Sequence, residues 1–273
     1  MSDSVLVSVS GRVMEVSLNR PPVNAITVDF SYELFDAFKQ LNDTEDLRCG
    51  ILYGGDNDKG IFSAGWDLKA FAAGEEQPNE DGSFDLGPGG LGGLPEFFDL
   101  YKPVIAALDG HAIGGGFELA LGADLIVMAE DAYFSLPEMQ RGFLPDAGAI
   151  QKLHHRVPYN VAVDLMLTGR RLYADEAKHW GLVRDVVPKG AVLDKAREIA
   201  SGIAEGAPLV SRAFKEFMRH NAYTSPEEAH QASRVAWLGR SEMPIYEEML
   251  KSDDFKEGPA AFAEKRPPDF KGR

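Results

Sequence analysis

The run of residues 104–121 constrains the fold more than any other part of the chain, because apolar residues, glycines and one acid are interleaved there too tightly for a surface segment. Residues 104–108 (VIAAL) form a continuous apolar stretch, with Pro103 before it and Asp109-Gly110 after it. This pattern is typical of a buried strand that ends in a tight turn. We therefore expect a core strand at residues 104–108.

A glycine triplet, Gly114 to Gly116, leads from this strand into residues 117–121 (FELAL), which are apolar on every side except for Glu118. A helix that is hydrophobic all round belongs inside a protein. Carboxylates are almost never fully buried unless they are paired or used. Glu118 is therefore a candidate functional residue.

The same order of strand, glycine turn and helix can also form an anion site, since the first helical N–H groups lack partners and glycine lets a ligand approach the backbone. The alternative is a tight crossing in which the glycines serve packing alone. Residues 102–150 contain no GxGxxG motif, and the chain contains no GxxxxGK[ST] motif. Dinucleotide and P-loop sites therefore lose their main support.

Local patterns elsewhere predict further elements. Alternating apolar residues before and after Ser10-Gly11 predict a hairpin that turns there. A helix at residues 29–41 followed by a strand at 47–53 indicates a βαβ unit with parallel strands. Ser225-Pro226-Glu227-Glu228 is typical of a capping box with proline at the first helical position.

Several blocks of the sequence resemble one family, the enoyl-CoA hydratase/isomerase or crotonase superfamily. The resemblance covers nearly the whole chain and is carried, in the family's order, by LNRPPVNAI at 18–26, FSAGWDLK at 62–69, AALDGHAIGGGFELALGADLIVMAEDAYFSLPE at 106–138, GFLPDAGA at 142–149, LTGRRLYADEAKHWGLVRDVV at 167–187 and FAEKRPPDF at 262–270. Within the superfamily, the blocks around Glu118 and Asp146 look most like carnitinyl-CoA dehydratases, also called crotonobetainyl-CoA hydratases.

The fold class that the resemblance implies is α/β, a crotonase (ClpP/crotonase-like) spiral of ββα units. It implies a core domain at residues 1–205 and a C-terminal helical trimerisation region at residues 206–273. The partner is then a second copy of the chain, in a homotrimer or a dimer of trimers.

The resemblance also implies an acid/base pair, Glu118 and Glu138, which would hold and activate the water in a hydratase. Two carboxyls close together suit that chemistry, because their mutual repulsion can keep one of them protonated near neutral pH. For Glu138 the alternative is an ordinary acid at the start of a helix after Pro137.

Asp146 departs from the plain hydratase pattern, which usually has glycine there. Carnitinyl-CoA dehydratases are similar in carrying an Asp at this point, as are dienoyl-CoA isomerases. A third carboxyl suits proton transfer along a dienoyl chain or binding of a trimethylammonium group. The alternative is that Asp146 only caps a helix that begins near Ala147.

By resemblance, the backbone N–H groups of Trp66 and Gly115 form an oxyanion hole for the thioester carbonyl. The Trp66 side chain either packs in the core or lines the pocket. The rest of the acyl-CoA site implied by the resemblance is Arg20, Ala64, Gly65, Asp67, Leu68, Lys69, Gly114, Phe262 and Lys265. Residues 72–95, rich in Gly, Glu and Asp, predict a mobile surface loop that acts as a lid over the acyl pocket or is a plain insertion.

Charge limits the partners. The formal net charge of −15 opposes nonspecific binding to nucleic acid or anionic membranes, so we expect neither as a partner.

Cys49 is the only cysteine, which excludes an intramolecular disulfide and favours a reducing compartment. The N-terminus lacks a signal-peptide pattern, and we expect a cytoplasmic protein.

The histidines show no metal-ligand spacing, and GxSxG is absent. We therefore predict no metal and no cofactor other than the CoA of the substrate. The implied function is an acyl-CoA hydro-lyase that reversibly adds water to an enoyl-CoA. The alternatives are a dienoyl- or enoyl-CoA isomerase and, from another class, an RNA-binding relative, which the net charge opposes.

Overall fold

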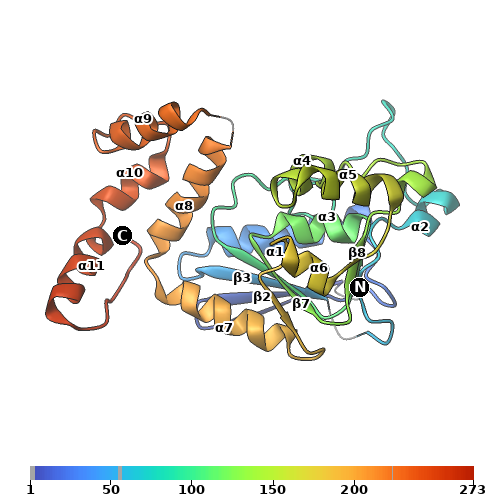
Figure 1. Cartoon of the computed structure of the whole chain (residues 1–273), viewed down its shortest axis with the longest axis horizontal. Coiled ribbons are helices and arrows are strands. Elements are labelled where there is room, and N and C mark those ends of the chain that lie inside the picture. Colours follow the sequence, from blue (N-terminus) through green and yellow to red (C-terminus); the bar gives the residue numbers. More distant parts are fainter. Residues whose placement is uncertain (1–3, 55–56, 223) are drawn as a thin grey trace. The chain divides into compact units, whose positions relative to one another are not determined.

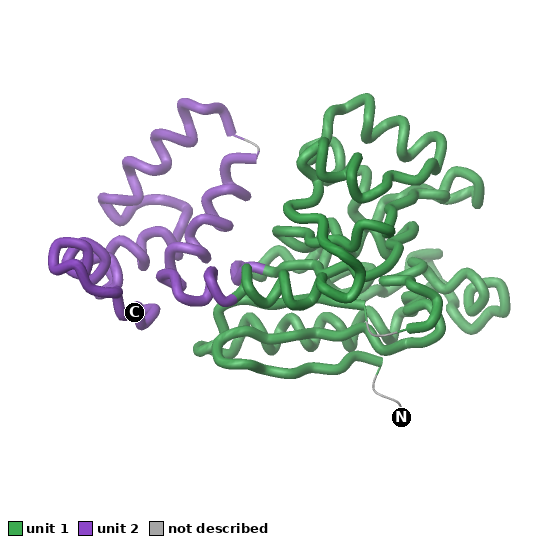
Figure 2. Tube along the Cα trace, turned by 60° about the horizontal axis from the view of Figure 1, so that its bottom comes forward, with its two compact units in different colours: residues 1–100, 104–200 green, residues 101–103, 201–273 purple. Residues whose placement is uncertain are grey.

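The computed structural model describes residues 4–54, 57–222 and 224–273 (Figure 1). The chain divides into two compact units (Figure 2). Unit 1 comprises residues 1–100 and 104–200, and unit 2 comprises residues 101–103 and 201–273. Both β-sheets belong to unit 1, while the described elements of unit 2 are helices.

Unit 1 contains two sheets. The first is six-stranded in the order β1-β2-β3-β5-β7-β10. Its strands are β1 (Val5–Ser10), β2 (Val13–Leu18), β3 (Cys49–Gly54), β5 (Val104–Leu108), β7 (Leu125–Ala129) and β10 (Asp185–Val187). The second is four-stranded in the order β4-β6-β8-β9. Its strands are β4 (Ile61–Ser63), β6 (His111–Ile113), β8 (Tyr133–Ser135) and β9 (Leu172–Tyr173).

The chain alternates between the two sheets. Strand β3 is followed by β4 and α2 (Leu68–Ala73), β5 by β6 and α3 (Gly115–Gly122), and β7 by β8 and η1 (Glu138–Arg141). Successive strands pair in parallel within each sheet, β3 with β5 and β5 with β7, and β4 with β6 and β6 with β8. Each turn of the chain thus adds one strand to each sheet, which confirms the predicted spiral of ββα units.

The predicted N-terminal elements are confirmed. Strands β1 and β2 pair antiparallel, and the pair Ser10 and Val13 leaves Gly11-Arg12 as a two-residue turn, with Gly11 at φ 57°. Helix α1 (Val28–Asp43) then carries the chain to β3, which pairs in parallel with β2. The left-handed backbone at Gly11 suits this short turn, because glycine has no side chain to clash there.

Strand β2 is buried along its whole length. Figure 1 shows α1 and α3 along one face of the sheet and α7 (Val192–Glu205) along the other. From α7, Arg197 donates through Nε and Nη2 to the two carboxylate oxygens of Glu15 at 2.7 and 2.8 Å. This bidentate pairing compensates the charge of Glu15, which is only 6% exposed in the middle of the strand.

The remaining helices of unit 1 are α4 (Ala149–Lys152), η2 (Leu153–His155), α5 (Tyr159–Thr168) and α6 (Ala174–His179). The helices of unit 2 are α8 (Pro208–Asn221), α9 (Pro226–Ala236), α10 (Pro244–Lys251) and α11 (Asp253–Glu264). The predicted capping box at Ser225 is present, since Ser225 Oγ accepts from Glu228 N and Glu228 Oε2 accepts from Ser225 N. Among the described residues, no helix is both long and apolar enough to cross a membrane.

The prediction of a surface loop at residues 72–95 is right for only part of the segment. Residues 77–83 are exposed, whereas residues 89–95 are buried. The buried part packs on α1, where Gly92 N donates to Ser31 Oγ at 2.9 Å. A Cβ atom on Gly93 would lie only 2.3 Å from Phe35 N. The glycines that suggested a loop therefore allow two backbones to come close together.

We expect Gly93→Ala to lower the free energy of unfolding by more than Gly82→Ala. Both glycines have positive φ, 69° and 84°, so each alanine bears a similar left-handed strain of about 1–2 kcal/mol. Only at position 93 does the new methyl group also meet backbone, whereas nothing lies within 4 Å of it at position 82. Overpacking should add about 1–3 kcal/mol, measurable by chemical denaturation. Equal losses would contradict the close packing of this segment on α1.

Candidate active site

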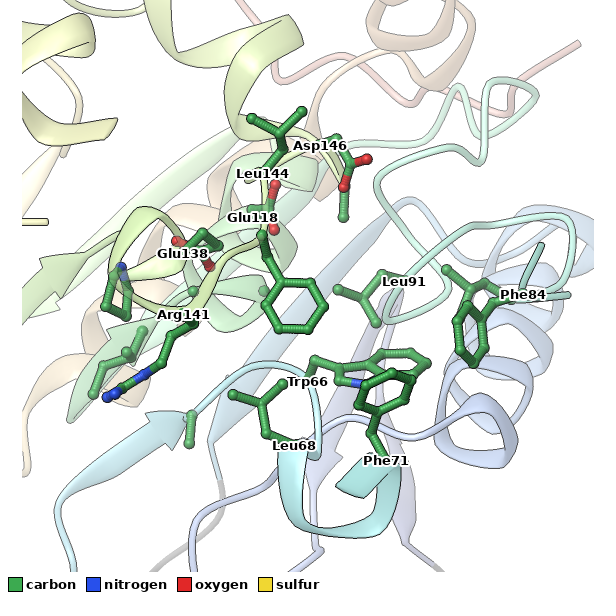
Figure 3. Close-up of a pocket in the computed structure, with 18 residues that line it drawn as sticks. Trp66, Leu68, Phe71, Phe84, Leu91, Glu118, Glu138, Arg141, Leu144 and Asp146 are labelled. Atoms are coloured by element: carbon green, nitrogen blue, oxygen red, sulfur yellow. The ribbon is translucent and has the colours of Figure 1, made fainter. Parts of the chain in front are cut away.

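A cavity of about 350 Å³ lies in unit 1 at the first turn of α3 (Figure 3). It brings together many of the residues that the sequence predicted for the site, although they come from separate parts of the chain. The predicted residues that line it are Ala64, Trp66, Leu68, Gly114, Gly115, Glu118, Glu138 and Asp146. These residues come from the β4–α2 connection, the starts of α2 and α3, η1 and the segment before α4.

Glu118 lies in the first turn of α3 and is only 3% exposed. Its Oε1 accepts a hydrogen bond from Ala149 N, the first residue of α4, at 3.1 Å. Burial, together with the nearby charges of Glu138 and Asp146, raises the pKa of Glu118 to about 8. At neutral pH this carboxyl group therefore holds a proton.

Glu138 is the first residue of η1 and follows Pro137. This is the position expected under the alternative of an ordinary acid at the start of a helix. Its side chain nevertheless belongs to the cavity (Figure 3). A Cβ atom on Gly114 would lie 2.6 Å from Glu138 Oε1, so the carboxyl group covers the turn that leads into α3. Glu138 Oε2 is buried and has no hydrogen-bond partner in the described part of the chain, and burial raises the pKa of this group. A buried acceptor of this kind is costly unless something else uses it.

Asp146 lines the same cavity and is exposed. Helix α4 begins at Ala149, its N-cap residue is Gly148, and no side chain caps it. The alternative that Asp146 serves as a helix cap is therefore wrong. Its negative charge instead acts on the cavity, where it contributes to the raised pKa of Glu118.

The two predicted oxyanion donors lie next to each other. Gly65 has φ 80°, and a Cβ atom on it would lie 2.6 Å from Gly115 N. A Cβ atom on Gly115 would in turn lie 3.4 Å from Trp66 N. Within residues 4–54, 57–222 and 224–273, neither Trp66 N nor Gly115 N donates a hydrogen bond. Two adjacent unpaired N–H groups at one cavity are what an oxyanion hole requires.

The Trp66 side chain lines the cavity. Of the two alternatives for this side chain, lining the pocket is therefore right and packing in the core is wrong. Its ring meets the Phe84 ring at a centroid distance of 5.3 Å and an angle of 74°. Phe84, Leu86 and Leu91 all come from residues 72–95, and all three line the cavity. That segment therefore forms one wall of the pocket.

Arg20 and Asp67, two of the residues predicted to bind the acyl-CoA, pair with each other next to Trp66. Arg20 Nη1 donates to Asp67 Oδ2 at 2.8 Å and to Ala25 O at 2.9 Å. Asp67 Oδ1 accepts from Ala70 N and so caps α2. Lys69 is exposed on the first turn of α2. Contact of these three residues with CoA stays a prediction.

Phe262 and Lys265 belong to unit 2. Phe262 lies in the last turn of α11 and is 87% exposed, and Lys265 ends that helix with φ 55°. The neighbouring Arg266 pairs with Glu257 and Glu264, so it is already neutralised. Contact of Phe262 and Lys265 with CoA also stays a prediction.

Sequence inspection missed several residues that line the cavity, namely Phe71, Phe84, Arg141, Phe143 and Leu144. Arg141 could have been found from its spacing, because it follows Glu138 by three residues in one 3₁₀ turn. Residues three apart in a 3₁₀ turn lie on the same face. The aromatic residues had none, since each comes from a different segment and only the tertiary fold brings them together.

The chain is similar to known proteins along its length. A family model described as Enoyl-CoA hydratase/isomerase matches residues 8–273. A carnitinyl-CoA dehydratase of Salmonella paratyphi A is 44% identical over 273 residues, which cover 100% of both chains. The crystal structure of an enoyl-CoA hydratase from Mycobacterium tuberculosis H37Rv has a TM-score of 0.87 at 38% identity, with 100% of both chains covered. An enoyl-CoA hydratase from Bacillus anthracis has a TM-score of 0.86 at 33% identity, with 99% of this chain and 100% of that chain covered.

The raised pKa of Glu118 predicts a pH-dependent stability. Between pH 4.5 and about 8 the folded chain keeps a proton at Glu118 that the unfolded chain has lost. The free energy of unfolding should therefore fall as the pH rises through this range, by at most about 1.4 kcal/mol per pH unit from this group. Chemical denaturation between these pH values should show a flatter profile for Glu118→Gln than for the wild type. Parallel profiles would contradict the raised pKa.

Proposed function

The chain belongs to the enoyl-CoA hydratase/isomerase family, and on this premise we propose that it is an acyl-CoA hydro-lyase that reversibly adds water to the double bond of an enoyl-CoA thioester. Relatives named carnitinyl-CoA dehydratase and enoyl-CoA hydratase support a lyase of this kind. The observation that carries the proposal is the buried Glu138 Oε2, which has no hydrogen-bond partner among the described residues. It belongs to the cavity that Glu118 also lines, together with two N–H groups that donate to no described residue.

Glu118 and Glu138 supply the acid and the base. Hydration needs a base that takes a proton from water as the oxygen bonds to the β-carbon, and an acid that gives a proton to the α-carbon. The raised pKa of Glu118 keeps a proton on that carboxyl group at neutral pH, so Glu118 takes the role of the acid and Glu138 that of the base. Addition and elimination then use the same pair in opposite directions.

Trp66 N and Gly115 N stabilise the charge that the addition creates. When the water oxygen bonds to the β-carbon, the electron pair of the double bond moves toward the thioester carbonyl and forms an enolate. N–H groups that are in place before the reaction stabilise such an oxygen without reorganisation, typically by about 3–4 kcal/mol each. The donors need no movement here, because Gly65 already holds them side by side.

For the acyl group we propose crotonobetainyl-CoA, which hydrates to carnitinyl-CoA. The support is the name of the relative that is 44% identical along the whole chain, together with the third carboxyl group at Asp146. That third acid also favours the second candidate, a dienoyl- or enoyl-CoA isomerase. An isomerase would move the double bond without taking oxygen from water.

We propose that the chain works in the cytoplasm. The proposed assembly is a homotrimer or a dimer of trimers formed through residues 206–273. Exposed apolar residues on α8 support association, since Val210, Phe214 and Met218 recur every fourth residue and are 50%, 62% and 56% exposed. Residues at this spacing share one helix face, and an apolar face of this kind marks an interaction surface.

Glu138→Gln should lower kcat for hydration of crotonobetainyl-CoA or crotonyl-CoA by about 10²–10⁴-fold, because the amide removes one of the two proton-transfer groups. The dissociation constant for a saturated acyl-CoA should stay within about threefold, because the shape of the cavity is kept. Glu130→Gln, on an exposed glutamate outside the cavity, is the matched control and should leave both values unchanged. A normal rate for Glu138→Gln would overturn the assignment of the acid/base pair.

A further inference from the structure

Glu138 depends on a short turn for its position. Helix η1 is a 3₁₀ turn of four residues with no side-chain cap. A 3₁₀ turn has poorer hydrogen-bond geometry than an α-helix, so it needs support from other elements. Glu138 Oε2 has no hydrogen-bond partner among the described residues, so this oxygen does not anchor the carboxyl group. The place of the carboxyl group therefore depends on what holds the backbone on each side of it.

Two hydrogen bonds tie that backbone to the end of α5. Ser135 Oγ, three residues before Glu138, donates to Gly169 O at 2.9 Å. Gln140 Nε2, two residues after Glu138, donates to Thr168 O at 2.6 Å. The last carbonyl groups of a helix have no partner inside it, so these two consecutive oxygens are available as acceptors. The chain on both sides of Glu138 is thus tied to one helix end.

This helix end is itself held in place. Gly169 ends α5 with φ 63°, and a Cβ atom on it would lie 2.6 Å from Gln140 Nε2. Arg170 follows directly and pairs with Asp164 of α5. Its Nη1 and Nη2 also donate to the two carboxylate oxygens of Glu176 in α6, at 2.9 and 2.8 Å. Because bidentate pairs of this kind fix geometry as well as charge, the two acceptor oxygens lie on a firm support.

We propose that Gln140, together with Ser135, positions Glu138 for proton transfer by tying η1 and β8 to the end of α5. The inference rests on the proposed function, because it assigns a positioning residue to the base of that reaction. Gln140 is exposed and is not among the described residues that line the cavity, so it acts through the turn that carries Glu138. A general base must lie within hydrogen-bond reach of the proton it takes, and a misplacement of about 1 Å can lower the rate by about 100-fold.

The alternative is that the two hydrogen bonds serve only the packing of η1 on α5. The two roles predict different effects of one substitution in two backgrounds. If Gln140 acts through the Glu138 carboxyl group, its loss lowers the rate only while that carboxyl group is present. If Gln140 serves packing alone, its loss lowers the rate by the same factor in both backgrounds, or in neither.

The test is a double-mutant cycle on hydration of crotonobetainyl-CoA or crotonyl-CoA, whichever the wild type converts faster. Gln140→Met keeps the length of the side chain and removes the donor. In the wild-type background it should lower kcat about 10- to 100-fold and leave KM within about threefold. In the Glu138→Gln background it should lower kcat by less than about twofold, because the base is already gone. Gln40→Met, on an exposed glutamine of α1, is the matched control and should change neither value.

Gly169→Ala tests the same contact from the side of α5. Its new methyl group would displace the Gln140 amide, whereas nothing lies within 4 Å of a Cβ atom on Gly181. Both glycines have positive φ, 63° and 78°, so Gly181→Ala bears a similar left-handed strain without the contact. We expect kcat of Gly169→Ala to be about tenfold lower than that of Gly181→Ala. Circular dichroism checks that each variant is folded.

A wild-type kcat in both Gln140→Met and Gly169→Ala would overturn the inference and leave the hydro-lyase proposal standing. An equal loss of kcat with and without the Glu138 carboxyl group would also overturn it, because the hydrogen bond would then serve packing alone. A wild type that hydrates neither substrate would overturn the hydro-lyase proposal, and the inference with it.

Discussion

The site depends on one carboxyl group that the fold holds out of water. Glu118 is in the first turn of a helix whose residues from Gly115 to Leu121 are all buried. Burying an ionised carboxylate is costly, so the group keeps its proton and its pKa rises to about 8. The hydrogen bond from Ala149 N fixes one oxygen and opposes this rise, but burial dominates. A proton is therefore stored in the cavity at neutral pH.

Close backbone packing brings the other groups to the same place. The end of β4 and the β4–α2 connection lie so close to the start of α3 that a Cβ atom on Gly116 would lie 2.3 Å from Ser63 O, and one on Gly65 would lie 2.6 Å from Gly115 N. Glycine at these positions is what lets two successive turns of the ββα spiral touch. The third turn adds η1 and with it Glu138. One fold repeat thus supplies Trp66 N, the next supplies Gly115 N and Glu118, and the last completes the acid pair.

Patterns within short segments of the sequence predicted much of the fold and of the site. The buried strand at 104–108, the hairpin at Ser10-Gly11 and the burial of Glu118 all follow from local periodicity. Composition was a poorer guide, because glycines at residues 89–95 indicated a surface loop, whereas this loop is buried and packs on α1. The aromatic residues of the cavity had no local signal, since Phe71, Phe84 and Phe143 meet only in the folded chain. The alternative that Asp146 caps a helix beginning near Ala147 is wrong, because that helix begins at Ala149 and no described side chain caps it.

The most direct measurement determines which atoms of water are incorporated into the product. The purified chain is incubated with crotonobetainyl-CoA in water labelled with heavy oxygen and deuterium, and the product is analysed by mass spectrometry. The account predicts labelled oxygen on the β-carbon and deuterium on the α-carbon, both lost when Glu138 is replaced by Gln. A product with a shifted double bond and no labelled oxygen would contradict a hydro-lyase and favour the isomerase.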